Sequence, residues 1–277
     1  MKKYTAWCSD YNNISGEGQL ARKFVKSLKL RKIKIHKPLH SFFLSEYIYP
    51  YFGIIILWFF YLQGHRTIYI NYLPLWNVPI FLLCPPKTIF GPITGSIQIN
   101  NLRGLKSFIR YFIFPCLYKL SLYLLKLKNN KVIFATNILN KHTKDVIKKT
   151  NIETNFILKN IKLKKTKKKN KKIYDLIVYY RNHENKFFQH HNDLIDKFLK
   201  KNKKVIIFGD YSNFSDAKYI GRLSKKKVEN YLKLSKYSLS GDDNLLSLFN
   251  LQCIHHNVKI IYNIKLKFQV VYYLRRF

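Results

Sequence analysis

Short apolar runs alternate with amphipathic stretches along the chain. Runs rich in β-branched and aromatic residues predict strands at 4–8, 67–72, 132–136, 175–180, 204–210, 219–221, 235–240 and 258–262. Apolar residues spaced three and four apart predict helices from Leu20 onward, over 190–201, from Ser224 and over 245–255. Strands that alternate with helices are typical of parallel sheets, so the pattern predicts an α/β protein.

Two longer apolar stretches raise the question of a membrane span. Residues 51–62 are too few to cross a bilayer comfortably, and residues 107–127 include Arg110, Pro115, Lys119 and Lys126. Charge at the centre of a bilayer is costly. An amphipathic helix pair lying on a membrane, or a buried helix with a basic edge, therefore fits 107–127 better than a span does. Residues 1–25 lack the apolar core of a secretory signal.

A lysine-rich run at 162–172 divides this pattern in two. Like charges repel and resist packing, so the run is predicted to link an N-terminal domain, 1–161, to a shorter C-terminal domain, 173–277. Both domains are expected to be Rossmann-like. Ligands of open α/β sheets bind beyond the carboxyl ends of the strands, so we expect the site in a cleft across which the domains face each other.

The charge of the chain is strongly one-sided. There are 51 Lys and Arg against 14 Asp and Glu, for a formal net charge of +37. Such a field attracts nucleic acid or an anionic membrane surface. Drift toward A+T-rich codons explains the same excess, because the chain is also rich in Asn, Ile, Tyr and Phe, and we favour drift as the main cause. The aromatic residues cluster in apolar runs, which makes nucleic acid the less expected partner.

Cysteine and histidine placement argues against metal and disulfides. The four cysteines are scattered without CxxC spacing, which speaks against structural zinc and a disulfide scaffold and favours a reducing cytoplasm. The histidine pairs at 190–191 and 255–256 lack acidic companions at ligand spacing. Neither a metal nor another cofactor is therefore expected.

Three polar segments follow predicted strands and are candidate binding loops. After the first strand, Gly16, Glu17 and Gly18 predict a glycine loop before a helix. Backbone amides there would approach a ligand closely, and the helix start favours an anion; the alternative is a tight turn without ligand. After 175–180, Arg181 and Lys186 suit a diphosphate, with His183 between them; the alternative is two surface cations. After 235–240 a polar loop leads into a predicted helix, whose first amides suit a phosphate while polar side chains suit sugar hydroxyls. The candidate residues are Asp243, Asn244 and Ser247. Ordinary helix capping by Asp242 or Asp243 is the alternative.

This order of segments resembles the GT-B glycosyltransferases, in particular the retaining, nucleotide-sugar-dependent enzymes of family 4, over nearly the whole chain. In that family a glycine-rich loop follows the first strand, and an Arg and a Lys after the first strand of the second domain hold the donor diphosphate. A short strand of the second domain then leads to an acidic loop and a helix, with two glutamates that have seven residues between them. Their counterparts here are Asn244 and Gln252, or Asp243 and Gln252. The segments 71–77 and 91–95 are also similar, the latter as a loop near the acceptor.

The resemblance implies a glycosyltransferase that moves a sugar from a nucleotide-sugar to a hydroxyl of a glycan or lipid-linked acceptor, without a metal. Arg181 and Lys186 would stabilise the departing diphosphate. The other implied donor contacts are Asp243, Asn244, Ser247 and Gln252, and the acceptor or phosphate loop is Gly16, Glu17 and Gly18. Asp10 and Glu17 are candidate general bases by position. The expected location is the cytoplasm or the inner face of its membrane.

The chain also departs from the family pattern. Neither glutamate is present, the small turn after the second is replaced by residues 255–257, and the C-terminal domain is expected to be short. A neutral amide gives up part of the strength of a charged hydrogen bond. A catalytically weakened homologue and a basic nucleic-acid-binding α/β protein therefore stay open as alternatives.

Overall fold

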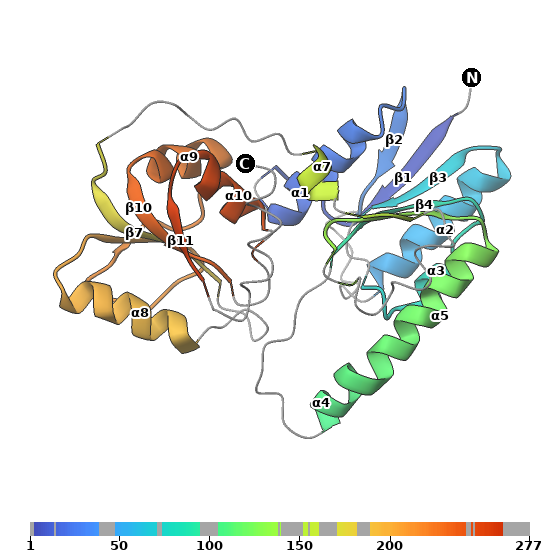
Figure 1. Cartoon of the computed structure of the whole chain (residues 1–277). Helices are drawn as coiled ribbons and strands as arrows, with labels where there is room; N and C mark the ends of the chain where they lie inside the picture. Colours follow the sequence, from blue (N-terminus) through green and yellow to red (C-terminus); the bar gives the residue numbers. More distant parts are fainter. Residues whose placement is uncertain are drawn as a thin grey trace. The chain divides into compact units, whose positions relative to one another are not determined.

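The computed structural model (Figure 1) divides into two compact units, Met1–Ser96 with Asn100–Ile161, and Lys162–Phe277 with Ile97–Ile99. It describes residues 3–13, 15–38, 48–70, 74–94, 105–137, 139, 152–154, 156–160, 171–181, 189–241, 245 and 247–262. Most of the lysine-rich run lies outside these ranges, so its role as a linker stays a prediction.

The first unit is built on a parallel sheet in the order β2-β1-β3-β4-β5-β6. The strands are β1 (Tyr4–Cys8), β2 (Ile33–His36), β3 (Arg66–Ile70), β4 (Ile89–Ile93), β5 (Lys131–Phe134) and β6 (Ile152–Glu153). Ala6 of β1 pairs with Ile35 on one side and with Ile68 on the other. Because β1 and β3 are buried on both faces, they are nearly continuous apolar runs rather than alternating ones.

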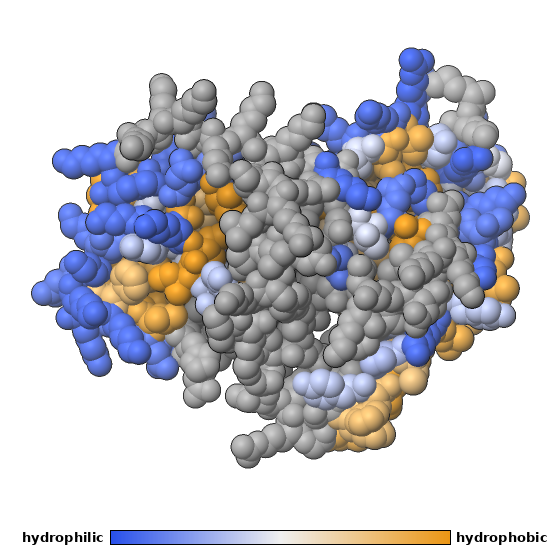
Figure 2. Space-filling view, viewed as in Figure 1, coloured by the Kyte–Doolittle hydropathy of each residue, from blue (hydrophilic) through white to orange (hydrophobic). Residues whose placement is uncertain are grey.

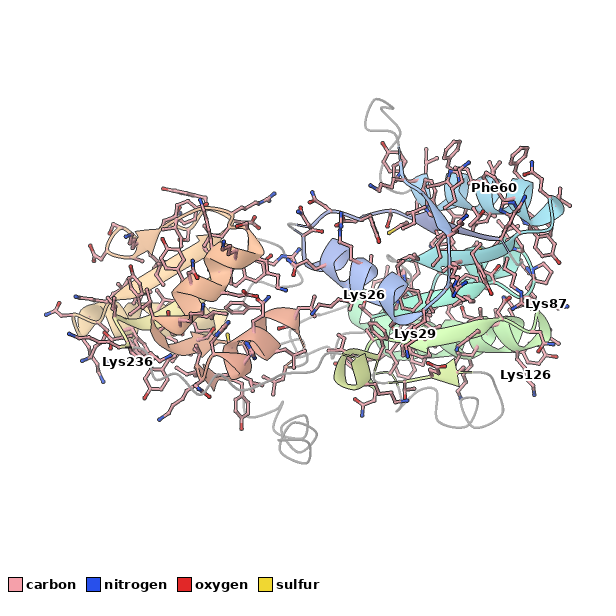
Figure 3. The ribbon with its side chains drawn as sticks, turned by 90° about the horizontal axis from the view of Figure 1, so that it is seen from above. Lys26, Lys29, Phe60, Lys87, Lys126 and Lys236 are labelled. Carbon is pink, nitrogen blue, oxygen red and sulfur yellow. The ribbon has the colours of Figure 1, made fainter. Side chains whose placement is uncertain are left out.

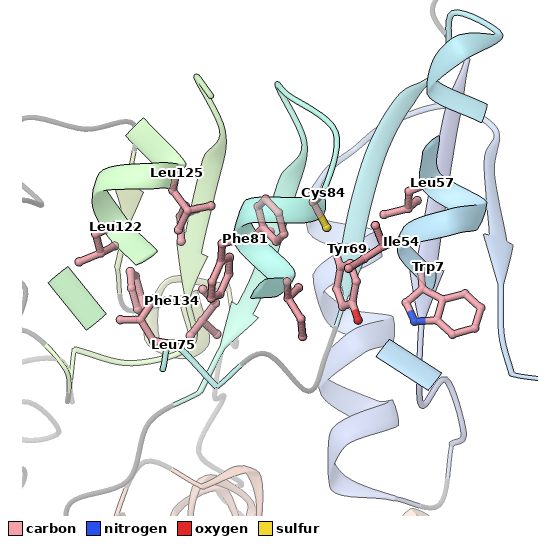
Figure 4. Close-up of a cluster of buried hydrophobic side chains, with 14 of the residues drawn as sticks. Trp7, Ile54, Leu57, Tyr69, Leu75, Phe81, Cys84, Leu122, Leu125 and Phe134 are labelled. Atoms are coloured by element: carbon pink, nitrogen blue, oxygen red, sulfur yellow. The ribbon is translucent and has the colours of Figure 1, made fainter. Parts of the chain in front are cut away.

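Helices cover both faces of this sheet (Figure 1). They are α1 (Gly16–Ser27), α2 (Tyr49–Leu62), α3 (Val78–Leu83), α4 (Leu105–Phe108), the π-helical turn η1 (Ile109–Ile113), α5 (Phe114–Leu127) and α7 (Phe156–Asn160). The main core lies between the sheet and α2, α3 and α5, where Trp7, Tyr69 and Phe90 from three strands meet Leu57 and Phe81 (Figure 4). On the opposite face, α1 meets α7 through Phe24 and Phe156, whose ring centroids are 5.6 Å apart.

The second unit carries a second parallel sheet, in the order β11-β10-β7-β8-β9. Its strands are β7 (Tyr174–Tyr180), β8 (Val205–Gly209), β9 (Lys218–Tyr219), β10 (Ser235–Leu239) and β11 (Lys259–Ile261), and its helices are α8 (Gln189–Lys200), α9 (Lys225–Lys233) and α10 (Leu248–His255). Ile177 and Ile206 pack toward α9 and α10, while Leu176 and Ile207 pack toward α8. Helices therefore lie on both faces, and the α/β prediction is confirmed for both units.

Every predicted strand is present, with its ends within two residues of the prediction. The prediction missed β2, β4 and β6. Strand β4 reads IFGPI. The resemblance implied a loop over 91–95, and this was wrong for 91–93, which lie in the strand with a register shift between Phe90 and Ile93. Of the two long apolar stretches, 51–62 belongs to α2 and 107–127 runs through α4, η1 and α5. Among the described residues, no helix has the length and apolar character that crossing a membrane requires.

His256, the C-cap of α10, should make the stability of the second unit depend on pH. Its ring is buried, and neither ring nitrogen has a hydrogen-bond partner among the described residues. Burial lowers the pKa of His256 to about 4 from its ordinary value of 6.5; other charges contribute less. These are His255, Lys233 and Lys172, which lower the pKa, and Glu229, which raises it.

Between pH 6.5 and 4 the unfolded state therefore binds a proton that the folded state does not bind. We expect the free energy of unfolding to fall as the pH falls through this window, and His256→Phe to flatten that dependence. Urea titrations at stepped pH, followed by circular dichroism, measure both curves. Identical pH dependence in the two proteins would contradict the prediction.

Candidate functional site

The second sheet has a switch point between β7 and β10. The chain runs from β7 outward to β8 and β9, then returns to β10 on the other side of β7. At such a point two neighbouring connections leave the sheet in opposite directions, and ligands bind outside the carboxyl ends of the strands. The carboxyl ends of β7 and β10, after which the sequence predicts two binding loops, are therefore neighbours at this switch point.

Arg181 directly follows Tyr180, the last residue of β7, and is exposed. The local backbone is fixed by the neighbouring strand, because the N–H of Asp210 donates to the Tyr180 carbonyl at 3.0 Å. The predicted partner Lys186 and the intervening His183 lie outside the described residues. The structure thus places Arg181 at the expected strand end, and its pairing with Lys186 stays a prediction.

The end of β8 carries an ion pair that the sequence analysis did not identify. Arg222 Nη2 lies 2.9 Å from Asp210 Oδ1, and the hydrogen bond raises the pKa of Arg222 above its usual value. The Tyr219 hydroxyl donates to the Gly209 carbonyl at 3.2 Å. Arg222 already has a carboxylate partner, whereas the structure shows Arg181 exposed beside the switch point. Asp210 and Arg222 lie twelve residues apart, so local spacing gave no sign of this pair.

Helix α10 begins later than predicted. Its N-cap is Ser247, whose Oγ accepts from the Asn250 N–H at 3.1 Å, and the Asn250 side chain donates to the Leu245 carbonyl at 3.1 Å. The helix therefore starts at Leu248 rather than near Leu245. Ser247 has a capping role, although its O–H can still donate to a ligand. Gln252 lies half-buried in the helix, while Asp243 and Asn244 lie outside the described residues.

Two buried serines at the same edge were missed from the sequence. Ser240 directly follows β10 and Ser212 follows β8; both side chains are buried, and neither hydroxyl has a hydrogen-bond partner among the described residues. Ser240 is held by its own backbone, whose N–H donates to the Ile261 carbonyl at 2.9 Å. Buried hydroxyls usually find partners, so Ser240 has hydrogen-bonding capacity to offer at the switch point. The available signal was the small residues Ser238 and Gly241 on either side of Leu239 and Ser240, at the end of a predicted strand.

In the first unit, the loop after β1 is organised around a carboxylate. The order β2-β1-β3 places the switch point between β1 and β3. Asp10 Oδ1 accepts from the Asn12 N–H at 2.8 Å, and Oδ2 accepts from the Ser15 hydroxyl. Ser15 Oγ in turn accepts from the Gly18 N–H at 2.9 Å. Both oxygens of this candidate base thus take part in holding the start of α1.

The predicted glycine loop is in fact the first turn of α1. The helix begins at Gly16, with Ser15 as its N-cap, so Gly16, Glu17 and Gly18 are helical rather than in a loop. A Cβ on Gly18 would lie 2.1 Å from the Asn12 carbonyl oxygen, whereas a Cβ on Gly16 would meet nothing within 4 Å. The chain's own close approach accounts for Gly18, which favours the tight-turn alternative at that position.

Charge at this helix start favours hydroxyls over phosphate. Glu17 is exposed in the first turn, where a carboxylate is favourable to the helix dipole but repels a bound anion. Cys8, at the end of β1, donates to the Asp10 carbonyl at 3.1 Å, and burial raises the pKa of its thiol to about 12. Cys8 is therefore protonated near neutral pH and is not a nucleophile. No group of three His, Cys, Asp or Glu in the described part of the chain could hold a metal.

These features define a protein of two doubly wound α/β units, each with polar residues at its switch point. No protein-family model matches the chain, and no curated protein sequence matches it. The chain is similar in structure to E. coli heptosyltransferase WaaC with ADP-2-deoxy-2-fluoro heptose, with a TM-score of 0.36 and 10% identity over 95% of this chain and 88% of that one. The same enzyme with ADP gives a TM-score of 0.34 and 11% identity, over 95% and 86%. A likeness this weak establishes neither a family nor an activity.

Proposed function

We propose that this chain is a glycosyltransferase that moves a sugar from a nucleotide-sugar donor to a hydroxyl of a glycan or lipid-linked acceptor. The observation that carries the proposal is the position of Arg181 at the carboxyl end of the central strand β7. The buried hydroxyl of Ser240 and the N-terminus of α10 follow the neighbouring strand β10. A guanidinium, a hydroxyl and helix amides are the groups that bind a diphosphate.

Departure of the nucleoside diphosphate is the demanding step, because negative charge grows on the phosphate oxygens. Fixed positive groups aimed at those oxygens lower the barrier. We assign this role to Arg181, with Lys186 as its partner, so that no metal is needed. Asp243, Asn244 and Gln252 are proposed to contact sugar or ribose hydroxyls, and Ser247 to donate its O–H to a phosphate.

The acceptor is proposed to bind at the switch point of the first unit. Glu17, which is exposed in the first turn of α1, is proposed to contact an acceptor hydroxyl. Asp10, whose two oxygens accept hydrogen bonds at the start of α1, and Glu17 both stay candidate general bases. From the resemblance to family 4 we also propose that the transferred sugar retains its configuration. Because the chain departs from the family pattern, a catalytically weakened homologue stays open as an alternative.

The direct test is nucleotide binding at the carboxyl edge of the second sheet, where Arg181 lies. We expect UDP, GDP or ADP, or one of their sugars, to raise the melting temperature of the full chain, since a ligand of the folded state stabilises it. Arg181→Ala should weaken that binding by about tenfold to a hundredfold, as for loss of a charged hydrogen bond. Titration calorimetry measures the dissociation constant.

The matched control is Lys201→Ala, which removes one exposed positive charge between α8 and β8, at the amino ends of the strands. It should leave the dissociation constant unchanged, whereas Arg181→Lys should recover part of the affinity. Equal effects of Arg181→Ala and Lys201→Ala would mean that only overall charge matters, and would place the donor site elsewhere.

Nucleic-acid binding is the second candidate, favoured by the net charge of +37. A filter-binding series separates the two functions. Tight DNA or RNA binding that weakens steeply with salt, together with no response to any nucleotide or nucleotide-sugar, would favour this candidate over sugar transfer.

A further inference from the structure

Helix α2 exposes a stripe of apolar side chains to solvent. Its outward residues are Tyr51, Phe52, Ile55, Phe59 and Leu62. Phe59 is 59% exposed and Leu62 is 79% exposed, although the same helix buries other side chains in the core beside Trp7. Contiguous apolar surface of this kind marks a site of interaction rather than ordinary solvent-facing helix.

The stripe continues over the neighbouring helices. Leu82 and Leu83 of α3 are exposed, as are Phe108, Phe112, Leu120, Tyr123 and Leu127 along α4, η1 and α5. Helix α3 contacts both α2 and α5, and Trp58 Nε1 of α2 donates to the Leu83 carbonyl at 2.6 Å. Figure 2 shows hydrophobic residues gathered over α4 and the adjoining part of α5. We call the outward surface of α2, α3, α4, η1 and α5 the α2–α5 face.

The charged side chains described on this face are all positive. Lys119 and Lys126 lie exposed on α5 among its apolar residues. Lys87 lies beside the end of the same helix, where its N–H donates to the Lys128 carbonyl at 3.0 Å (Figure 3). The sequence contains no aspartate or glutamate between Glu46 and Asp145, so no acidic residue of this region offsets them.

This combination of apolar and positive side chains indicates which kind of partner covers the α2–α5 face. A second copy of the chain would bring the same positive charge to the contact, and an ordinary protein surface offers no matching sheet of anions. A nucleic acid would find an α2 stripe with no positive side chain. An anionic bilayer offers both partners at once, with phosphates for the lysines and an apolar layer for the aromatic and aliphatic side chains.

We propose that the α2–α5 face docks on an anionic lipid membrane. Its apolar side chains enter the boundary between headgroups and acyl chains. The lysine stems lie along this apolar surface while their ammonium groups reach the lipid phosphates. The inference concerns the first unit alone and stands whether or not the second unit binds a nucleotide-sugar.

Vesicle co-sedimentation tests the apolar part of the face. The full chain should bind vesicles of phosphatidylcholine and phosphatidylglycerol in equal parts, and part of this binding should survive about 1 M salt, at which the Debye length is about 3 Å. The double variant Ile55→Glu, Phe59→Glu should lower the partition coefficient by about tenfold or more. A second pair, Tyr123→Glu with Leu127→Glu on α5, should do the same.

The matched control is Ile173→Glu, which adds a carboxylate at a residue of the second unit that is itself 47% exposed. It should leave vesicle binding unchanged to within about twofold, as expected for a surface change away from the contact. Melting curves of all the variants confirm that the exposed substitutions leave the fold intact.

Cys116 gives a direct readout of insertion. It is exposed on α5, while Cys8, Cys84 and Cys253 are buried. An environment-sensitive fluorophore on Cys116 should shift to shorter wavelength when the labelled protein binds anionic vesicles. The control is the double variant Cys116→Ser, Ile173→Cys, which moves the exposed thiol to the second unit. The same fluorophore attached to that new thiol should not shift.

Three results would overturn the proposal. One is vesicle binding that disappears fully at high salt and is equal in the wild type and in both glutamate double variants. Such binding would be adsorption by net charge alone. Another is a Cys116 fluorophore that does not respond to vesicles. The third is a concentration-dependent dimer that the Ile55→Glu, Phe59→Glu pair dissolves, without vesicle binding, because a second copy would then cover the face.

Discussion

Replacing Gly18 with alanine is expected to lower the free energy of unfolding of the first unit by about 3 kcal/mol, at the upper end for overpacking. The new Cβ would lie 2.1 Å from the Asn12 carbonyl oxygen and 2.5 Å from the Asn12 nitrogen. These are backbone atoms, so no side-chain rotation relieves the clash. The loop must move, and Asp10 and Ser15 hold that loop against the helix start.

Gly16→Ala is the control from the same helical turn. Nothing lies within 4 Å of its added Cβ, so the change should be within about 0.5 kcal/mol and toward greater stability, because alanine suits a helix better than glycine does. Urea unfolding followed by tryptophan fluorescence measures both, since Trp7, Trp58 and Trp76 all belong to the first unit. Similar midpoints for the two variants would contradict the account of Gly18.

The sequence predicted the fold class because most strands are buried on both faces. Runs such as 175–180 and 204–210 are nearly continuous in apolar residues. In the helices between such runs, apolar residues recur at helical spacing. The missed strands lack this signal. In strand β2, isoleucines alternate with Lys34 and His36, and strand β6 has only two residues. Strand β4 contains the Gly-Pro pair that ordinarily indicates a turn.

The positions of the candidate sites were predictable to the level of the strand end. A residue that follows a buried strand in a parallel sheet lies at the carboxyl edge, and Arg181 does so. The details were not predictable, because they depend on contacts that the chain makes only once folded. Gly16 and Gly18 were assigned to a loop because glycine is typical of turns. Ser15 is a residue type that commonly caps a helix, but its hydrogen bonds with Asp10 and Gly18 form only in the folded chain. Ser240 and the Asp210–Arg222 pair likewise become visible only once the sheet is assembled.

Replacing Gly209 with alanine is expected to destabilise the second unit by about 3 kcal/mol or more, through backbone strain and overpacking together. Gly209 ends β8 with a φ of +113°, and an added Cβ would lie 2.2 Å from the Tyr180 carbonyl oxygen and 3.1 Å from the Tyr179 ring. Tyr180 directly precedes Arg181. The substitution should therefore also weaken nucleotide binding in whatever fraction stays folded, because relief of the clash moves the end of β7.

Gly221→Ala separates the two causes, because Gly221 also has a positive φ, +67°, but an added Cβ there meets nothing within 4 Å. That variant should lose only about 1 kcal/mol, the cost of the left-handed conformation. Unfolding followed by far-ultraviolet circular dichroism reports the second unit along with the first. Tryptophan fluorescence reports the first unit alone, and its midpoint should stay unchanged in both variants. A Gly209→Ala protein as stable as Gly221→Ala would show that the carbonyl of Tyr180 does not set the limit at this strand end.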